Sequence, residues 1–271
     1  MSTPSPVLWG VLNVTPDSFS DGGAYLDPAV AIDHALALRD QGASVIDVGG
    51  ESTRPGASRI SLEEEAKRVL PVITALASAR VSVSVDTMNS ATAQAAIDAG
   101  ASIVNDVSGG LADSAMASVV AAAGVDYAIM HWRAHSDVME DHAHYDDVVT
   151  EVTGELRLRV DAAVEAGIDP NRIIVDPGLG FAKTPEHNWA LLARIEAIAG
   201  LGHRVLVGAS RKRFLGELIR YEHEPADRDG VSAALAVALA GRGVWGFRVH
   251  NPLIHAQALE VWQAVERGGT R

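Results

Sequence analysis

The sequence predicts an α/β protein with a single domain over residues 1–271, folded as a (β/α)8 TIM barrel. Short apolar, β-branched runs alternate with longer helical patterns eight times along the chain. The length of 271 residues is ordinary for one barrel, and the 48% of hydrophobic residues suffice for a large core. No linker or change of composition divides the chain. The main alternative is an open doubly wound sheet, which usually has fewer repeats and one abrupt switch point.

Eight segments have the continuous apolar character of parallel strands that are buried on both faces. They are residues 7–14, 44–48, 81–85, 102–105, 126–130, 172–175, 204–207 and 245–249. The helical patterns that follow them cover residues 28–41, 61–79, 90–99, 114–123, 145–166, 186–199, 227–241 and 252–266. Glycines such as Gly42, Gly100 and Gly167 stand just past these helices, where a left-handed cap favours glycine.

The composition excludes several classes of function. The formal net charge is −13 and no basic run is present, so we expect no binding of nucleic acid. The absence of cysteine excludes disulfides and thiolate chemistry. The N-terminus has no pattern of a signal peptide and no stretch of 18 apolar residues occurs, so we expect a cytoplasmic protein without a membrane span. An anionic substrate would then require positive charge that is concentrated locally.

Polar side chains stand at the end of nearly every predicted strand, where the loops of a barrel build active sites. Asp86, Asn105 and Asp176 offer two carboxylates and an amide to one mouth. Two carboxylates in one pocket repel each other unless a proton donor or a cation lies between them. A heterocycle rich in N–H groups would satisfy this need, and so would Mg²⁺. The carboxylates alone do not separate the two.

The same strand ends also carry positive charge. These residues are Arg54, Arg211, Lys212, Arg248 and His250. Arginine and lysine beside a helix N-terminus form an anion site, for which phosphate or diphosphate is the natural ligand.

Four longer segments carry a resemblance to a known family. They are NVTPDSFSDGG at 13–23, DVGGESTRPG at 47–56, DPGLGFAK at 176–183 and GASRK at 208–212, with RVH at 248–250 closing the set. Together they resemble the dihydropteroate synthases, pterin-binding barrel enzymes of folate biosynthesis that sulfonamides target. The resemblance covers nearly the whole chain and is greatest to bacterial, actinobacterial-type members. The first two motifs are long and highly specific.

The resemblance implies a transferase that joins 6-hydroxymethyl-7,8-dihydropterin diphosphate to p-aminobenzoate and releases diphosphate, with Mg²⁺ as cofactor and a homodimer as the assembly. It implies a pterin site of Asp86, Asn105, Met130, Asp176, Phe181, Lys212 and Arg248. It implies a p-aminobenzoate site of Phe19, Thr53, Pro55, Ser210 and Lys212. It implies a diphosphate site of Arg54, Arg248 and His250, and Asn13 as a ligand of the metal. The catalytic residues by this resemblance are Arg54, Asp86, Lys212 and Arg248.

One position departs from the family pattern, because Asn251 follows the RVH motif where the family usually has Asp. Two alternatives stay open at this point. A methyltetrahydrofolate-binding methyltransferase-type barrel would share Asp86, Asn105 and Asp176 but not the first motif. A catalytically silent pterin-binding paralogue would keep every motif. The histidine-containing segment 133–145 is more typical of a solvated loop than of a metal-binding tract.

Overall fold

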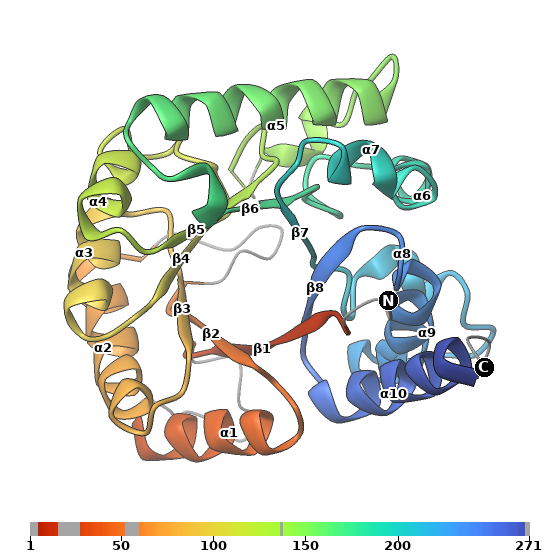
Figure 1. The fold of residues 1–271 in the computed structure, drawn as a ribbon, viewed down its shortest axis with the longest axis horizontal. Coiled ribbons are helices and arrows are strands. Elements are labelled where there is room, and N and C mark those ends of the chain that lie inside the picture. Colours follow the sequence, from red (N-terminus) through yellow and green to blue (C-terminus); the bar gives the residue numbers. More distant parts are fainter. Residues whose placement is uncertain (1–4, 16–27, 52–59, 136–137, 269–271) are drawn as a thin grey trace.

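The computed structural model describes residues 5–15, 28–51, 60–135 and 138–268. In this part of the chain, eight parallel strands form a closed barrel in which each strand pairs with the next and β8 pairs with β1. Figure 1 looks along the barrel, with the strands at the centre and the helices in a ring around them. The (β/α)8 fold predicted from the alternating pattern is therefore confirmed.

The strands agree closely with the predicted runs. They are β1 (Val7–Asn13), β2 (Val45–Gly49), β3 (Val83–Asp86), β4 (Ile103–Asp106), β5 (Asp126–Met130), β6 (Ile173–Asp176), β7 (Arg204–Val207) and β8 (Val244–Val249). The α-helices are α1 (Pro28–Asp40), α2 (Leu62–Ser78), α3 (Ser90–Asp98), α4 (Met116–Ala123), α5 (Val148–Glu165), α6 (Pro185–Ala193), α7 (Ile195–Ala199), α8 (Arg213–Gly216), α9 (Asp229–Leu239) and α10 (Pro252–Gly268). The 3₁₀ turns are η1 (Met139–His142), η2 (Pro170–Arg172) and η3 (Pro225–Arg228).

Two details of the helices differ from the prediction. The single helix expected at 186–199 is divided into α6 and α7, because Arg194 leaves the helical conformation at φ −121° and ψ 35°. The Arg194 guanidinium lies 3.1 Å from the carboxylate of Asp147, the N-cap of α5. The short helix α8 was not expected, because a helix of four residues is too short to give a periodic pattern.

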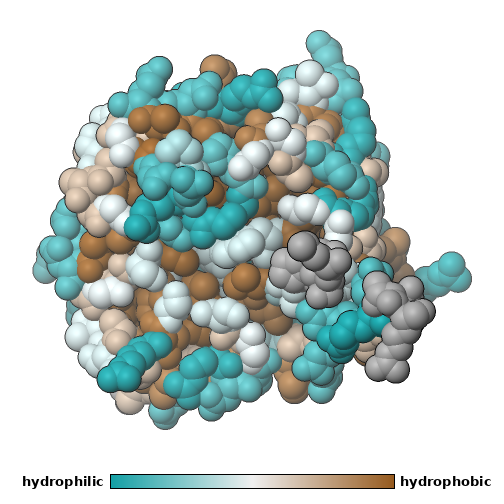
Figure 2. Space-filling view, in the orientation of Figure 1, coloured by the Kyte–Doolittle hydropathy of each residue, from teal (hydrophilic) through white to brown (hydrophobic). Residues whose placement is uncertain are grey.

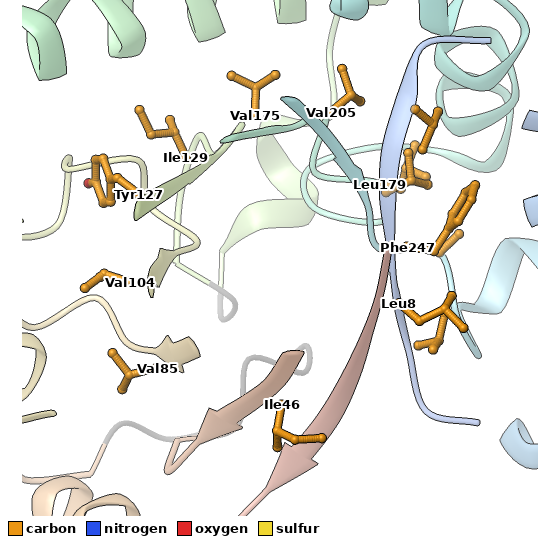
Figure 3. Packing of buried hydrophobic residues seen from close by; sticks show 14 of the residues in the cluster. Leu8, Ile46, Val85, Val104, Tyr127, Ile129, Val175, Leu179, Val205 and Phe247 are labelled. Carbon is orange, nitrogen blue, oxygen red and sulfur yellow. The ribbon is translucent and has the colours of Figure 1, made fainter. Parts of the chain in front are cut away.

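Side chains of the strands alternate between two separate cores, since successive residues of a strand point to opposite faces. One set packs between the barrel and the helices, and Figure 3 shows Leu8, Ile46, Val85, Val175 and Phe247 pointing outward from their strands. The other set fills the barrel interior. Its buried members are Trp9, Val45, Ile103, Ala128, Ile174 and Leu206. The side chains two residues further along these strands reach the C-terminal mouth of the barrel.

The alternation has one irregularity, between β7 and β8. Val205 pairs with Val244, but Leu206 pairs with Gly246, so Trp245 is an extra residue in β8. Trp245 packs against the inward-facing core, with its ring centroid 6.1 Å from that of Trp9. This bulge allows Trp245 and Arg248 to face the same side of the strand.

The surface gives two further observations. On the face shown in Figure 2, hydrophilic and hydrophobic residues are interspersed. Among the described helices, none combines the length and the apolar character that crossing a membrane requires.

Candidate active site

Four strands bring one row of residues to the mouth of the barrel. Asn13 pairs with Gly49, Gly49 with Asp86, and Asp86 with Asn105 in the register of β1 to β4. A Cβ atom at Gly49 would lie 3.6 Å from both Asn13 Oδ1 and Asp86 Oδ2. The glycine therefore leaves space between these two oxygens. The predicted positions Asn13, Asp86 and Asn105 lie side by side in the fold.

The guanidinium of Arg248 lies between the carboxylates of Asp47 and Asp86. Arg248 Nη2 donates to Asp86 Oδ2 at 2.8 Å, and Arg248 Nε donates to Asp47 Oδ2 at 2.6 Å. Asp47 is fully buried and the Asp86 side chain is 7% exposed. Burial raises the pKa of Asp86 to about 7, against the lowering effect of Arg248. Arg248 thus partly offsets the effect of burial, which alone would raise the pKa of Asp86 further.

Asp47 was missed as a site residue by the sequence analysis. Its Oδ2 also accepts a hydrogen bond from Asn105 Nδ2 at 3.1 Å, so one oxygen contacts two predicted pterin-site residues. A signal was available: Asp47 opens the second motif, and its position two residues before Gly49 places it on the inward face of β2.

Asp176 ends β6 and is held by the loop that follows it. Gly178 N–H donates to Asp176 Oδ1 at 2.7 Å, and burial raises the pKa of Asp176 while Lys212 opposes that shift. Gly178 has φ +65°, and a Cβ there would lie 2.2 Å from the carbonyl oxygen of His131. Only glycine fits this turn. Met130 is buried and pairs with Asp176 in the register of β5 and β6.

Lys212 lies against the same loop. Its Nζ donates to the Leu179 carbonyl oxygen and lies 4.7 Å from the centroid of the Phe181 ring. Burial lowers the pKa of Lys212 to about 8, and Asp176 opposes the shift. The structure therefore brings Asp176, Phe181 and Lys212 together, as the resemblance implied.

A buried polar network around Lys183, which was not predicted from the sequence, holds the backbone of the 178–183 loop. Lys183 Nζ donates to His131 Nδ1 at 2.9 Å and to the carbonyl oxygens of Gly178 and Phe181 at 3.0 and 2.9 Å. The other ring nitrogen of His131 lies 2.8 Å from Glu155 Oε2. His131 points away from the barrel interior, because it follows the outward-facing residue pattern of Tyr127 and Ile129.

Two of the basic residues at the strand ends, Arg211 and Arg248, form ion pairs with carboxylates of the protein. Arg211 forms two hydrogen bonds to the Asp229 carboxylate, at 2.7 and 2.8 Å, which neutralise its charge. Asn251 Nδ2 donates to the same carboxylate at 3.2 Å. Asn251 thus places a neutral donor beside Asp229, where the usual Asp would place a second carboxylate.

Ser210 and His250, predicted for different subsites, are in direct contact. The His250 N–H donates to Ser210 Oγ at 3.2 Å, and His250 Nδ1 lies 3.0 Å from the same oxygen. The loops after β7 and β8 therefore meet at one point of the mouth. Both residues lie close to Lys212 and Arg248 along the chain.

Four predicted residues lie outside the described part of the chain: Phe19, Thr53, Arg54 and Pro55. Asp106, next to Asn105, faces away from the mouth, where Tyr127 Oη donates to its Oδ2 at 2.8 Å. In the described ranges, including His135, His142 and His144, no cluster of three or more His, Cys, Asp or Glu side chains could hold a metal ion.

The fold and this arrangement define a class: a (β/α)8 barrel enzyme whose mouth presents buried acceptors to a heterocycle with several N–H groups. A family model described as pterin binding enzyme matches residues 9–250. The chain is 50% identical to the dihydropteroate synthase of Mycobacterium leprae, over 93% of this chain and 90% of the relative. It is 41% identical to that of Bacillus subtilis, over 97% and 90%.

The solved structures agree. The chain resembles the Xanthomonas albilineans dihydropteroate synthase with 4-aminobenzoic acid, with a TM-score of 0.90 and 43% identity over 97% of this chain and 93% of that one. It resembles the Yersinia pestis dihydropteroate synthase with a sulfonamide drug complex, with a TM-score of 0.91 and 37% identity over 97% and 95%. The chain belongs to the pterin-binding enzyme family and, within it, to the dihydropteroate synthases. The family predicted from the motifs is confirmed.

Proposed function

We propose that this chain condenses 6-hydroxymethyl-7,8-dihydropterin diphosphate with p-aminobenzoate to give 7,8-dihydropteroate and diphosphate. The observation that carries the proposal is the set of buried acceptors at one barrel mouth, Asp86, Asn105 and Asp176, in a chain of this family. A solved Xanthomonas albilineans relative, 40% identical, holds 7,8-dihydropteroate. A Thermus thermophilus relative, also 40% identical, holds 6HMPPP. These relatives favour a synthase over the methyltransferase-type alternative.

The acceptors suit a pterin because its 2-amino and ring N–H groups need hydrogen-bond acceptors. Asp86, Asn105 and Asp176 supply them, and Lys212 donates to an acceptor of the ring. An ammonium group has three donors, so Lys212 can contact the ring while it keeps the Leu179 carbonyl. Arg248, Phe181 and Met130 complete the walls of the pterin site.

The reaction needs no nucleophile from the protein. The bond between the pterin methylene carbon and the diphosphate oxygen breaks, and the diphosphate leaves with the electron pair. The arylamine nitrogen forms the new bond to that carbon and loses a proton. The electron-rich pterin stabilises positive charge at the methylene carbon, while Arg248, His250 and Arg54 stabilise the departing anion. Ser210 and Lys212 contact the p-aminobenzoate, together with Phe19, Thr53 and Pro55.

Mg²⁺ is proposed as the cofactor, with Asn13 as its protein ligand. Asn13 fits this role because its side-chain oxygen lies at the mouth beside Asp86, and Mg²⁺ prefers oxygen ligands. Phosphate oxygens of the substrate would complete the coordination of the ion. When bound, the ion would neutralise charge on the leaving diphosphate.

The assembly and the compartment belong to the same proposal. We propose a homodimer that covers the outer face of the last helices. Val231 and Leu235 of α9 pack partly against the core, whereas Leu253, Val261 and Val265 of α10 are exposed apolar side chains. The cytoplasm is proposed as the compartment, with which the absence of cysteine agrees. Sedimentation of the purified protein tests the dimer.

The decisive experiment is an assay of the purified chain with both substrates and Mg²⁺, in which dihydropteroate and diphosphate are measured together. Equal amounts of the two products support the proposal, and pterin binding without either product identifies a silent paralogue. Asp176→Ala should weaken pterin binding about ten-fold or more, because it removes a charge-assisted contact worth about 1.5–3 kcal/mol. Asp161→Ala, at an exposed position of α5, is the matched control and should leave pterin binding unchanged.

A further inference from the structure

The fully buried carboxylate of Asp47 lies beneath the acceptor row and has an unusual pair of contacts. Its Oδ2 accepts from Arg248 Nε at 2.6 Å and from Asn105 Nδ2 at 3.1 Å. Its Oδ1 is buried without a hydrogen-bond partner among the described residues. The Oδ2 atom is paired with Arg248, but a buried polar atom without a partner has a free-energy cost, and Oδ1 is such an atom.

We propose that Asp47 is a positioning residue that sets the ligand selectivity of the mouth, because it fixes the amide of Asn105 with its oxygen turned toward the ligand. The inference rests on the proposed pterin site. The ligand class it implies is a fused heterocycle that presents N–H donors, rather than carbonyl oxygens, to the position that Asn105 reads.

The orientation of the Asn105 amide follows from the chemistry of its neighbour. Asp47 Oδ2 accepts from Arg248 Nε and therefore presents an acceptor to Asn105, whereas a side-chain amide has one accepting and one donating end. The reverse orientation would place Asn105 Oδ1 about where Nδ2 now lies, 3.1 Å from Asp47 Oδ2, with two acceptors facing each other. Asp47 therefore allows only one orientation. Within the described part of the chain, no residue hydrogen-bonds Asn105 Oδ1, so this oxygen can accept from a ligand.

The same carboxylate connects Asn105 to Arg248. Asp47 takes Arg248 Nε, and the guanidinium then reaches Asp86 with Nη2. Two walls of the proposed pterin site, on β4 and β8, thus depend on one oxygen of β2. A carboxylate that served only to neutralise Arg248 would not need to contact Asn105, and the ratio of the affinities for two ligands that differ at the position read by Asn105 reports on the amide.

The test uses pterin and lumazine as probes, because lumazine has a carbonyl oxygen where pterin has its 2-amino group. Calorimetry gives the ratio of their affinities for the parent and for four variants. Asp47→Val removes the shared acceptor and should reduce the preference for pterin by about ten-fold or more, because the Asn105 amide is no longer held in one orientation. Asn105→Asp should lose most pterin binding, because it places two carboxylates against each other.

The conservative variant Asp47→Asn keeps one oxygen at this position. Because Arg248 Nε only donates, it holds that oxygen at the place of Oδ2, where the oxygen still accepts from Asn105 Nδ2. Pterin preference should therefore stay within a few-fold of the parent. Asp106→Asn is the control for a lost buried carboxylate, because Asp106 faces away from the mouth. It should lower stability and leave the pterin-to-lumazine ratio unchanged.

A second measurement does not depend on any ligand. In the free protein, the side-chain amide protons of Asn105 should exchange slowly with solvent in NMR spectra, and Asp47→Val should accelerate this exchange. If the parent binds no pterin, the proposed function fails, and the exchange measurement still decides the role of Asp47. An unchanged affinity ratio in folded Asp47→Val, or Asn105 exchange that is the same in parent and variant, would overturn the inference.

Discussion

Asp86 should be a residue at which binding and stability oppose each other. Its carboxyl is buried, and its pKa is raised from 3.8 to about 7, first by burial and despite Arg248. Between these two pH values the folded chain keeps a proton that the unfolded chain has released. The free energy of unfolding therefore falls as the pH rises through this window, and the loss is complete above about pH 7.

The size of the effect follows from the shift. The difference between 3.8 and about 7 corresponds to a loss of at most about 4 kcal/mol at pH 8. Asp86→Asn removes the ionisation but keeps an oxygen that can accept from Arg248 Nη2, while Asp47 still pairs with Nε. The value of about 4 kcal/mol already includes the ion pair with Arg248, but the buried amide adds a donor that needs a partner, so we expect the variant to be about 1–3 kcal/mol more stable than the parent at pH 8.

Thermal unfolding at pH 5 and pH 8 tests this reasoning. At pH 8 the melting temperature of Asp86→Asn should exceed that of the parent by about 2–8 °C. At pH 5, where the folded parent is mostly protonated, the advantage of the variant should be smaller by about 2–3 kcal/mol, and pterin binding should be weaker in the variant at both pH values. A variant that melts below the parent at pH 8, or that gains as much at pH 5, would refute the argument.

Three further substitutions probe the supports of the site. Gly178→Ala should lower the free energy of unfolding by more than about 3 kcal/mol in chemical denaturation, because the new Cβ meets a backbone oxygen at φ +65°. Gly230→Ala in α9 is the control: nothing lies within 4 Å of the new Cβ, so it should be neutral or stabilising by up to about 1 kcal/mol. Arg211→Lys should lower the free energy of unfolding by about 1 kcal/mol, because lysine cannot form both hydrogen bonds to Asp229. The remaining ion pair should contribute less as salt is added. Lys183→Met should cost about 1–3 kcal/mol for each buried acceptor left unpaired, and limited proteolysis should then cut the 178–183 loop faster.

Much of the fold was accessible from the sequence because a barrel repeats one pattern. Each strand is a short β-branched run, and parallel pairing then fixes where strand ends meet. This is why Asp86, Asn105 and Asp176 could be assigned to one mouth from their positions alone. The division between α6 and α7 was not accessible, because Arg194 has no turn-forming side chain and breaks the helix through its own backbone conformation.

The parts of the site that escaped prediction are those that depend on pairing across the barrel. Arg211 and Arg248 were both expected to give free positive charge, but each is matched to a carboxylate that lies far away in the sequence: Asp229, or Asp47 with Asp86. Buried charges must find such partners, yet spacing along a chain does not reveal which partner is chosen. The inward side chain of Asp47 could have been found by counting in twos from Gly49.

The extra residue in β8 has a consequence for how this strand can evolve. Without the bulge at Trp245, strict alternation would turn Arg248 outward into the helical layer and bring Phe247 inside. The bulge therefore determines which face of the strand each following side chain takes. Substitutions along β8 change one side chain each, whereas loss or gain of a single residue would exchange inside and outside for every position that follows, and would remove the guanidinium from both of its carboxylates at once.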